Sequence, residues 1–331
     1  MNKPLVGITM GDAAGIGPEI TLKALLIRET YQICRPVVYG DKGILDRIVK
    51  LYSLDMQINE VEDVEKAGQS FGTVDVLNYN NVDQSDFEYG VLSAKCGEAA
   101  VRYTIDAGKD ALAGKIQAMV SAPLNKEAMR MAGYHYEGQT QILGELCGSK
   151  NYGMLLVLGE FRLMLYTTHM SLRDACNAVT YDGILSKLQL ANDGMQFFNI
   201  KNPTIAVSAL NPHAGEGGLF GDEEIKAIVP AIKTAQKNGI NAVGPIPADT
   251  IFVKAKNGEY DLVIALYHDQ GNTAMKLLGF GSVVTLLAGL PVIRTSTGHG
   301  TAFDIAGKNI AKHENIQKAI ILAAQLGANR L

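Results

Sequence analysis

The sequence predicts an α/β protein in which parallel strands alternate with helices, and three observations support this prediction. Short runs rich in Val, Ile and Leu alternate with longer amphipathic stretches, which is typical of βα units. Hydrophobic residues make up 47% of the chain and charged residues 19%, which suits a sizeable buried core and excludes disorder. The 35 glycines exceed the roughly 23 of average usage, as expected where tight turns bring the backbone close to a ligand.

Six buried strands are predicted from the apolar runs. In chain order they are Leu5–Thr9, Val37–Tyr39, Gln117–Val120, Arg162–Thr167, Thr204–Ala209 and Leu262–Leu266. The clearest helix spans residues 223–238, with Asp222 as the predicted N-cap and Gly239 directly after its end. Its predicted buried face consists of Ile225, Ile228, Val229 and Ile232.

The length of 331 residues, at about 150 residues per domain, predicts two domains. The chain has no Pro- or Ser-rich linker and no internal repeat, so ordinary crossovers must join them. One boundary is expected soon after the strand that ends at Val120, and the other near His299. We therefore predict a first domain of about residues 1–125 plus 300–331, and a second of about residues 126–299.

Charge and cysteine usage exclude several classes of protein. The formal net charge is −4, from 30 basic and 34 acidic residues, with no run of like charges, so nucleic acid is not an expected partner. Four scattered cysteines without a C-x-x-C pair predict neither a disulfide framework nor a zinc ribbon. The longest uncharged run, Leu277–Ile293, is too short and too rich in Gly and Pro to cross a bilayer, and residues 1–11 lack a secretory pattern. These observations predict a soluble, cytoplasmic protein.

Three of the six histidines share one setting, since His169, His213 and His268 each come shortly after a predicted strand. Carboxyl ends of parallel strands meet at one edge of a sheet, where ligands bind, so the three imidazoles can converge there. Three imidazoles suit a catalytic divalent metal that keeps positions open for substrate oxygens. Asp269 or Gln270 could orient the imidazole of His268. The alternative is that each histidine is an ordinary hydrogen-bonded loop residue.

Two further features suit anionic ligands. The segment Gly11–Glu19 follows the first strand and opens a helix with Pro18, an arrangement that favours anions at the helix N-terminus, although its glycines could equally serve tight packing. It is neither a Rossmann fingerprint nor a phosphate-binding loop. Lys276 and Arg294 flank the uncharged run, where they could bind carboxylate or phosphate groups, or could simply be solvated.

Seven ordered motifs together resemble the 4-hydroxythreonine-4-phosphate dehydrogenase family of vitamin B6 synthesis. They are GDAAGIGPE, SAPLNKEAM, TTHMSLRDA, NPHAGEGGLFGDEE, GPIPADT, YHDQGN and GLPVIRTSTGHGTAFDIAGK, and they cover nearly the whole chain. The resemblance implies two α/β/α domains of the isocitrate/isopropylmalate dehydrogenase-like fold, with the active site in the cleft between them. It also implies a homodimer whose subunits share the site, and NAD or NADP as cofactor.

The resemblance also implies roles for individual residues. A divalent metal, Zn, Mg, Mn or Co, would be held by His169, His213 and His268, drawn from both subunits. Lys276 would act in catalysis and in substrate binding. The substrate-contacting positions of the family correspond to Gln139, Thr140, Lys276, Thr285 and Arg294. No residue can be assigned to the dinucleotide, and the general base is not identified.

Three positions depart from the biosynthetic pattern of the family. Where the family usually reads Gly-His-Thr-Glu, this chain has Gly138–Gln141, GQTQ, and Thr285 stands where Asn is usual. Two neutral amides replace a titratable His and a carboxylate, so the partner expected for a substrate ammonium is lost. The chain therefore resembles most closely the branch that oxidises D-threonate or D-erythronate 4-phosphate.

The resemblance implies metal-dependent oxidation of the C3 hydroxyl by NAD(P), followed by decarboxylation to dihydroxyacetone phosphate. The first alternative is 4-hydroxythreonine-4-phosphate dehydrogenase itself, with the two glutamines as tolerated substitutions. A second alternative, from another class, is a non-catalytic relative that binds a metal and a phosphorylated acid.

Overall fold

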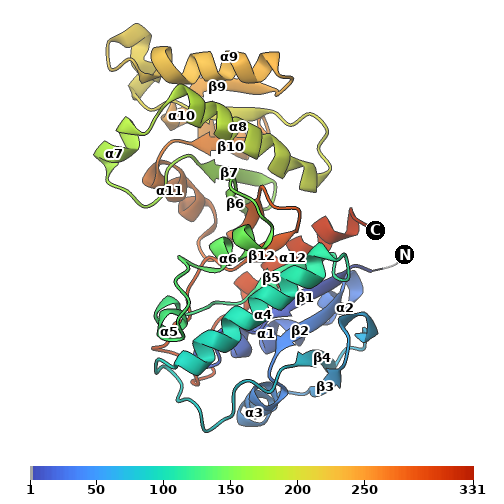
Figure 1. Cartoon of the computed structure of the whole chain (residues 1–331). Helices are drawn as coiled ribbons and strands as arrows, with labels where there is room; N and C mark the ends of the chain where they lie inside the picture. The colour runs from blue at the N-terminus through green and yellow to red at the C-terminus, as the bar shows by residue number, and fades with distance from the viewer. Residues whose placement is uncertain (1–2) are drawn as a thin grey trace. The chain divides into compact units, whose positions relative to one another are not determined.

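The computed structural model describes residues 3–331 and divides the chain into two compact units (Figure 1). Unit 1 comprises the chain up to Lys150 together with Leu290–Leu331, and unit 2 comprises Asn151–Gly289. The sequence predicted the boundaries near residues 125 and 299. They lie elsewhere because helices α5 (Lys126–Met131) and α6 (Gln139–Leu146) pack on a helix of unit 1, and residues 294–296 join its sheet.

Unit 1 contains a wholly parallel sheet with the strand order β3-β4-β2-β1-β5-β12. Its strands are β1 (Leu5–Thr9), β2 (Arg35–Gly40), β3 (Gln57–Val61), β4 (Thr73–Asn78), β5 (Ala118–Ser121) and β12 (Arg294–Ser296). The central strand β1 is buried at every position, as expected for a parallel strand that helices cover on both faces.

Helices cover both faces of this sheet (Figure 1). On one face α4 (Ala94–Leu112) packs against β1, β2 and β5 and carries α5 and α6. On the other face α12 (Glu314–Ala328) packs against β1, β5 and β12, beside α1 and α2. The remaining helices of the unit are α1 (Gly17–Leu25), α2 (Arg28–Ile33) and α3 (Lys42–Tyr52).

Unit 2 contains a mixed sheet with the strand order β11-β6-β7-β10-β8-β9. Its strands are β6 (Gly153–Leu158), β7 (Phe161–Leu165), β8 (Ile205–Ser208), β9 (Ala242–Ile246), β10 (Leu262–Ala265) and β11 (Val284–Ala288). Strands β7, β10, β8 and β9 are parallel, whereas β6 runs antiparallel to both of its neighbours. The carboxyl ends of the four parallel strands therefore share one edge.

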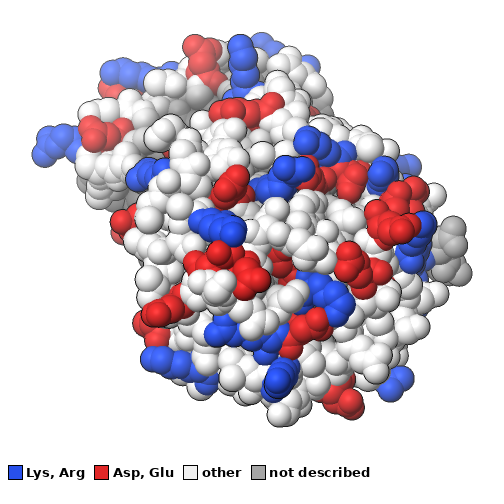
Figure 2. Space-filling view, turned by 60° about the horizontal axis from the view of Figure 1, so that its bottom comes forward, with Lys and Arg blue, Asp and Glu red and all other residues white. Residues whose placement is uncertain are grey.

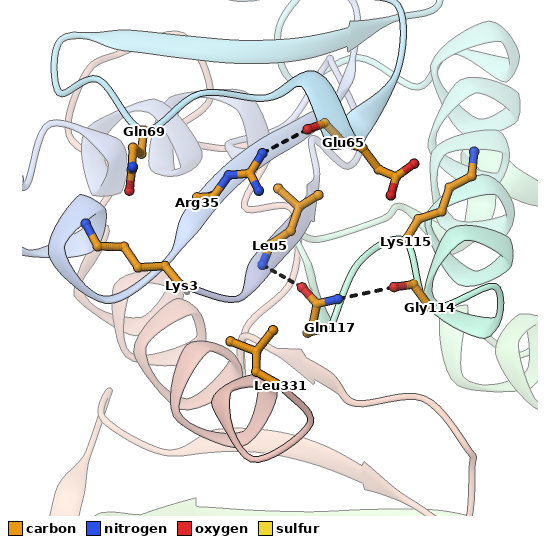
Figure 3. A pocket seen from close by; sticks show the side chains of 9 residues that line it. All are labelled: Lys3, Leu5, Arg35, Glu65, Gln69, Gly114, Lys115, Gln117 and Leu331. Carbon is orange, nitrogen blue, oxygen red and sulfur yellow. Dashed lines mark hydrogen bonds between the residues drawn. The ribbon is translucent and has the colours of Figure 1, made fainter. Parts of the chain in front are cut away.

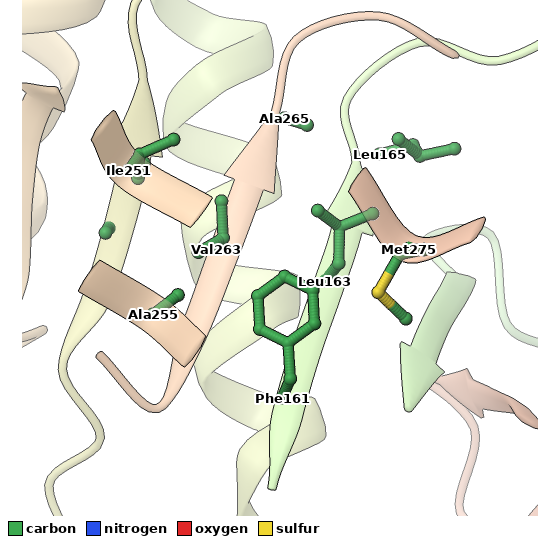
Figure 4. Packing of buried hydrophobic residues seen from close by; sticks show 9 residues of the cluster. Phe161, Leu163, Leu165, Ile251, Ala255, Val263, Ala265 and Met275 are labelled. Carbon is green, nitrogen blue, oxygen red and sulfur yellow. The ribbon is translucent and has the colours of Figure 1, made fainter. Parts of the chain in front are cut away.

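The core of unit 2 lies between this sheet and two helices, α10 (Ala248–Lys256) and α11 (His268–Gly279) (Figure 4). Alternate residues of β7 and β10 face these helices, as the two-residue period of a strand requires. The cluster consists of Phe161, Leu163, Leu165, Ala206, Ile251, Ala255, Val263, Ala265 and Met275. Helices α8 (Tyr181–Met195) and α9 (Val229–Lys237) pack on each other, and α8 contacts the sheet; α7 (Leu172–Asn177) precedes them.

The predicted helix over residues 223–238 is present but begins differently. Residues Glu224–Ile228 form a π turn, and the regular helix α9 follows from Val229. The π turn changes which residues face inward, and Ile225, predicted to be buried, is 52% exposed. The side chain of Asp222 pairs with Lys226 and does not cap the helix.

Two properties of the surface bear on possible partners. On the face shown in Figure 2, basic and acidic side chains are interspersed, with no extended field of one sign. This face carries no basic stripe of the kind that nucleic-acid-binding proteins present. Among residues 3–331, no helix is both long and apolar enough to cross a bilayer.

Candidate active site

The carboxyl edge of the unit 1 sheet is organised around Ser121–Pro123, the segment that leaves β5. The backbone N–H of Asp12 donates to Pro123 O at 3.0 Å and joins the end of β1 to this segment. The preceding Gly11 has φ +74°, and a Cβ there would lie 2.4 Å from Pro123 O, so only glycine fits this turn. The two chain segments thus approach closely at the edge where α/β sheets bind ligands.

Gln139 is the first of two predicted substrate residues that the structure places against this segment. Its Nε2 donates to Ala122 O at 2.9 Å, and its Oε1 accepts from Thr104 Oγ1 at 3.4 Å. Thr140 follows it in the first turn of α6. Gln141 instead bonds to residues near it in the chain. Its Oε1 accepts from the N–H of Glu137, and its Nε2 donates to Glu145.

Arg294 is the second predicted residue at this edge, and it is a buried cation. It is 5% exposed, and its Nε donates to Ser121 Oγ at 3.0 Å. No carboxylate of residues 3–331 lies within ion-pair distance of it, and burial lowers the pKa of its guanidinium to about 10. A buried guanidinium without a carboxylate partner is suited to an anionic ligand.

Asp12 adds a buried carboxyl group that the sequence analysis did not single out. It is fully buried; Oδ1 accepts from the N–H of Ala14 at 2.9 Å, and Oδ2 has no hydrogen-bond partner. Desolvation raises its pKa from 3.8 to about 6. The sequence could have indicated it, because Asp12 lies three residues after the end of β1 and within the motif GDAAGIGPE.

The glycines of that motif serve packing. The N–H of Gly15 donates to Asp12 O, and the N–H of Ile16 donates to Thr301 O. A Cβ at Gly17 would lie 2.4 Å from Met10 O. Because the amides of Gly15 and Ile16 already have partners in a buried segment, the packing interpretation is favoured over an anion site at the start of α1.

Side-chain hydrogen bonds join the carboxyl ends of β7, β8 and β10 in unit 2. Thr167 Oγ1 donates to Leu266 O at 2.8 Å. Gln270 accepts from the N–H of Leu266 at 2.7 Å and donates to Ala209 O at 2.8 Å, so one buried amide spans the ends of β10 and β8. Gln270 therefore fixes the strand ends and does not orient His268.

His169 and His268 lie side by side at this edge, with ring centroids 6.0 Å apart. His169 follows β7, and His268 is the first residue of α11. Nδ1 of His268 lies 2.6 Å from Asp269 Oδ1, a contact that fixes the ring and leaves Nε2 free. The predicted role of Asp269 in orienting the imidazole therefore has a matching contact.

His213 follows β8 on a strained loop. Residues 213–217 all have left-handed backbone, with φ between +42° and +77°, and the imidazole is exposed. Such a conformation costs roughly 1–2 kcal/mol for each residue that is not glycine.

Within residues 3–331, no three His, Cys, Asp or Glu side chains are grouped closely enough to hold a metal. His213 is therefore not grouped with His169 and His268 closely enough for the three to share one ion within a single chain.

The remaining predicted residues, Lys276 and Thr285, also lie in unit 2. Lys276 is exposed on α11, eight residues after His268, or about 12 Å along the helix axis. Thr285 is 6% exposed in β11, opposite Leu156 of β6.

A cavity of about 570 Å³ in unit 1 lies away from these residues (Figure 3). Its lining includes Leu5 and Arg35, the first residues of β1 and β2, and Gln117, which directly precedes β5. The cavity is therefore at the amino ends of the strands, opposite the edge that carries Gln139 and Arg294.

The chain matches the protein family described as "Pyridoxal phosphate biosynthetic protein PdxA" over residues 32–323. It belongs to the PdxA family. A protein of Oceanobacillus iheyensis named "Putative D-threonate 4-phosphate dehydrogenase" is 43% identical over 330 residues, 99% of each chain. The family resemblance inferred from the seven motifs is thus confirmed.

Two crystal structures of PdxA relatives confirm the α/β fold class. A 4-hydroxythreonine-4-phosphate dehydrogenase from Klebsiella pneumoniae is 38% identical with a TM-score of 0.93, and one from Burkholderia phymatum is 41% identical with a TM-score of 0.91. Each comparison covers 98% of this chain and 99% of the other. The fold is that of the isocitrate/isopropylmalate dehydrogenase-like enzymes, and dehydrogenase is the activity common to the names of these relatives.

Proposed function

We propose that this chain oxidises the C3 hydroxyl of a four-carbon phosphorylated acid, D-threonate or D-erythronate 4-phosphate, with NAD or NADP as hydride acceptor. The observation that carries the proposal is Arg294, a buried guanidinium without a carboxylate partner at the edge that also holds Gln139. It suits the phosphate or carboxylate of such a substrate. The name of the relative from Oceanobacillus iheyensis supports the four-carbon sugar acid as substrate.

The reaction balances as an oxidation followed by loss of CO₂. Oxidation at C3 would release a hydride, which a bound nicotinamide would accept, and the hydroxyl proton, which a base would accept. The product is a β-keto acid, which loses its carboxylate as CO₂ and takes up a proton at C2 to give dihydroxyacetone phosphate. Lys276, whose exposed ammonium lies on the same helix as His268, is also proposed to bind an anionic group of the substrate.

The donor set of unit 2 fits a divalent metal ion, with His169, His213 and His268 as the proposed ligands. The paired rings of His169 and His268 supply imidazole nitrogens, and Asp269 holds His268 so that Nε2 is free. When bound, the ion would polarise the substrate hydroxyl and stabilise developing negative charge. Asp269 would keep the tautomer and orientation of its neighbour constant.

A homodimer that shares the site between subunits is part of the proposal. It would supply the ligand that one chain does not gather, and the apolar surface at the end of α11 supports it. Leu277 and Phe280 are 83% and 84% exposed directly after Lys276. Large apolar side chains at this exposure are typical of surfaces that a partner covers.

The dinucleotide has no assigned contacts. The turn after β1, where doubly wound folds often hold a pyrophosphate, does not fit it, because the amides of Gly15 and Ile16 are buried and already paired. We therefore assign no residue of this chain to the cofactor.

The main alternative is oxidation of 4-hydroxythreonine 4-phosphate, favoured by the names of the two crystal structures. The amides argue for the sugar acids, since Gln139 and Gln141 are neutral and both are held by neighbouring protein groups. Neither supplies the carboxylate that a substrate ammonium would require.

The deciding experiment compares the three substrates side by side with the purified enzyme. NAD(P) reduction is followed with D-threonate, D-erythronate and 4-hydroxythreonine 4-phosphates, each with Mg, Mn, Co or Zn, and dihydroxyacetone phosphate is assayed separately. We expect kcat/KM for a sugar acid to exceed that for the amino substrate at least about 10-fold, the equivalent of one good polar contact. A preference for the amino substrate would instead support the alternative function, 4-hydroxythreonine-4-phosphate dehydrogenase.

A matched variant and a binding control accompany this experiment. Gln141→Glu restores the family's carboxylate while Gln139 stays in place, and it should narrow the preference for the sugar acid. Absence of both turnover and dinucleotide binding would support the non-catalytic relative instead.

A further inference from the structure

The loop that carries His213 is held in a conformation that its own sequence disfavours. His213, Ala214 and Glu216 have φ of +52°, +54° and +42°, although each has a side chain. Left-handed runs of this kind persist only where surrounding contacts determine them. A specific contact must therefore hold the loop in place.

Glu224 makes that contact. Its side chain is 2% exposed, and its Oε1 accepts from the backbone N–H groups of Leu210 and Asn211 at 2.9 and 2.8 Å. Its Oε2 accepts from Asn211 Nδ2 at 2.9 Å. Through these two residues the chain leaves β8 and enters the loop. One carboxylate therefore holds the start of the loop.

The same carboxylate also borders the interior of the loop. A Cβ at Gly215, which has φ +77°, would lie 2.8 Å from Glu224 Oε2 and 3.0 Å from Gly221 O. The loop thus folds back closely over the carboxylate. Glu224 is the first residue of the π turn, a local irregularity that occurs frequently at functional sites.

All three bonds to Glu224 require an acceptor. An ionised carboxylate only accepts, whereas the isosteric amide of glutamine places an NH₂ donor opposite at least one N–H. Asn211 cannot relieve the conflict by turning its amide, because its Nδ2 also donates to Glu223 Oε2 at 2.7 Å. The site therefore distinguishes Glu from Gln although their shapes are alike.

We propose that Glu224 is a positioning residue that holds the left-handed loop and thereby places the imidazole of His213 for metal binding. The inference rests on the proposed metal site, because it gives His213 its role there. Glu224 touches neither substrate nor metal in this account and acts through the loop. Residues that orient metal ligands typically contribute about 10- to 100-fold to metal affinity.

The test is a Co²⁺ titration of the full chain, followed by the visible absorption of the bound ion. We expect Glu224→Gln to weaken binding about 10-fold. Asp222→Asn, an exposed change two residues away, should stay within about twofold of wild type. Hydrogen exchange at the amides of Leu210 and Asn211 should speed up in Glu224→Gln and remain slow in Asp222→Asn.

His213→Ala separates the inference from the function on which it rests. If His213→Ala binds Co²⁺ as wild type does, the proposed metal site fails and the inference with it. If His213→Ala weakens binding and Glu224→Gln does not, the inference alone is overturned. In the double variant, Glu224→Gln should add nothing to His213→Ala; a further 10-fold loss would show that Glu224 acts elsewhere and would also overturn it.

Asn211→Ala is a milder variant for the case in which Glu224→Gln does not fold. It removes the bond to Oε2 and keeps both backbone bonds to Oε1. We expect a loss of about threefold in Co²⁺ affinity, part of the effect typical of such orienting groups. Unchanged affinity and unchanged exchange at Leu210 would contradict the proposal.

Discussion

The carboxyl edges of the two sheets hold their functional side chains in opposite ways. In unit 1 the candidate groups are themselves buried, with Arg294 5% exposed and Asp12 fully buried. In unit 2 the imidazoles of His169 and His213 are exposed, and the buried groups are those that hold the strand ends and loops, such as Gln270.

Because of this difference, substitutions in the two units should affect ligand binding and folding stability in different ways. A buried charge without a partner destabilises the fold while it prepares a site for a charged ligand. An exposed imidazole contributes little to folding, so its function and its stability effect can be changed independently. Substitutions in unit 1 should therefore change both properties, and substitutions of the histidines in unit 2 should change only one.

The largest effect is expected from His169→Ala. Loss of one ligand of the proposed metal removes several kcal/mol of transition-state stabilisation, and we expect kcat to fall about 10³-fold. The free energy of unfolding should change by less than about 0.5 kcal/mol, because the side chain is exposed. Steady-state kinetics and urea unfolding of the same preparation measure the two quantities.

His135→Ala is the control for this prediction, since His135 is also exposed and lies outside the candidate site. It should keep full activity. If His169→Ala instead loses more than about 1 kcal/mol of stability, His169 is a structural residue and the contrast between the two units does not hold.

The sequence predicted the fold class and six strands because long buried runs of Val, Ile and Leu carry a strong signal. Arg162–Thr167, for example, was predicted where β7 spans Phe161–Leu165. The short strand β12, Arg294–Ser296, was missed because its three residues are all polar and carry no strand pattern. That omission moved the domain boundary, since β12 pairs with β5 of unit 1.

A second effect is expected from Asp12→Asn and depends on pH. The folded pKa of about 6 lies above the unfolded value of 3.8, so the folded state binds the proton more tightly. Wild-type stability from this group is therefore present below about pH 4 and is lost as pH rises towards 6. Asparagine cannot ionise, so the variant should be more stable by about 3 kcal/mol at pH 8 and by about half of that at pH 5.

Denaturant unfolding of both proteins at the two pH values measures this difference. A constant gap between wild type and Asp12→Asn would show that Asp12 does not titrate in the folded state over this range. Asp12 would then not be an example of a buried charge that destabilises unit 1, because its burial would carry no electrostatic cost.

Roles that depend on hydrogen-bond geometry were not revealed by the sequence, which missed Glu224 and assigned Gln270 a different role. Glu224 and Gln270 owe their roles to backbone groups that become neighbours only in the folded chain, such as Leu210 N–H and Ala209 O. Candidate ligands are easier to name from the sequence, because a histidine after a predicted strand is visible there. His169 and His268 were predicted in this way, and their rings do lie side by side.

The smallest effect is expected from substituting two buried arginines, one in each unit. Arg162 is 6% exposed, pairs with Glu160 at 2.7 Å and stacks 4.4 Å from the centroid of the Phe198 ring. Arg294 is equally buried but has no carboxylate partner among residues 3–331. The first arginine is therefore bound within the protein, whereas the second keeps its charge available for a ligand.

Substituting methionine for each arginine should produce opposite results. Arg294→Met should lower kcat/KM about 10- to 100-fold, mainly through KM, because a charged hydrogen bond to substrate is worth about 1.5–3 kcal/mol. It should raise the unfolding midpoint, since a buried unpaired charge is removed. Arg162→Met should lower stability by about 1–2 kcal/mol and leave KM unchanged. If both variants lose stability and neither changes KM, then Arg294 is a structural cation like Arg162, and the anion site of unit 1 must lie elsewhere.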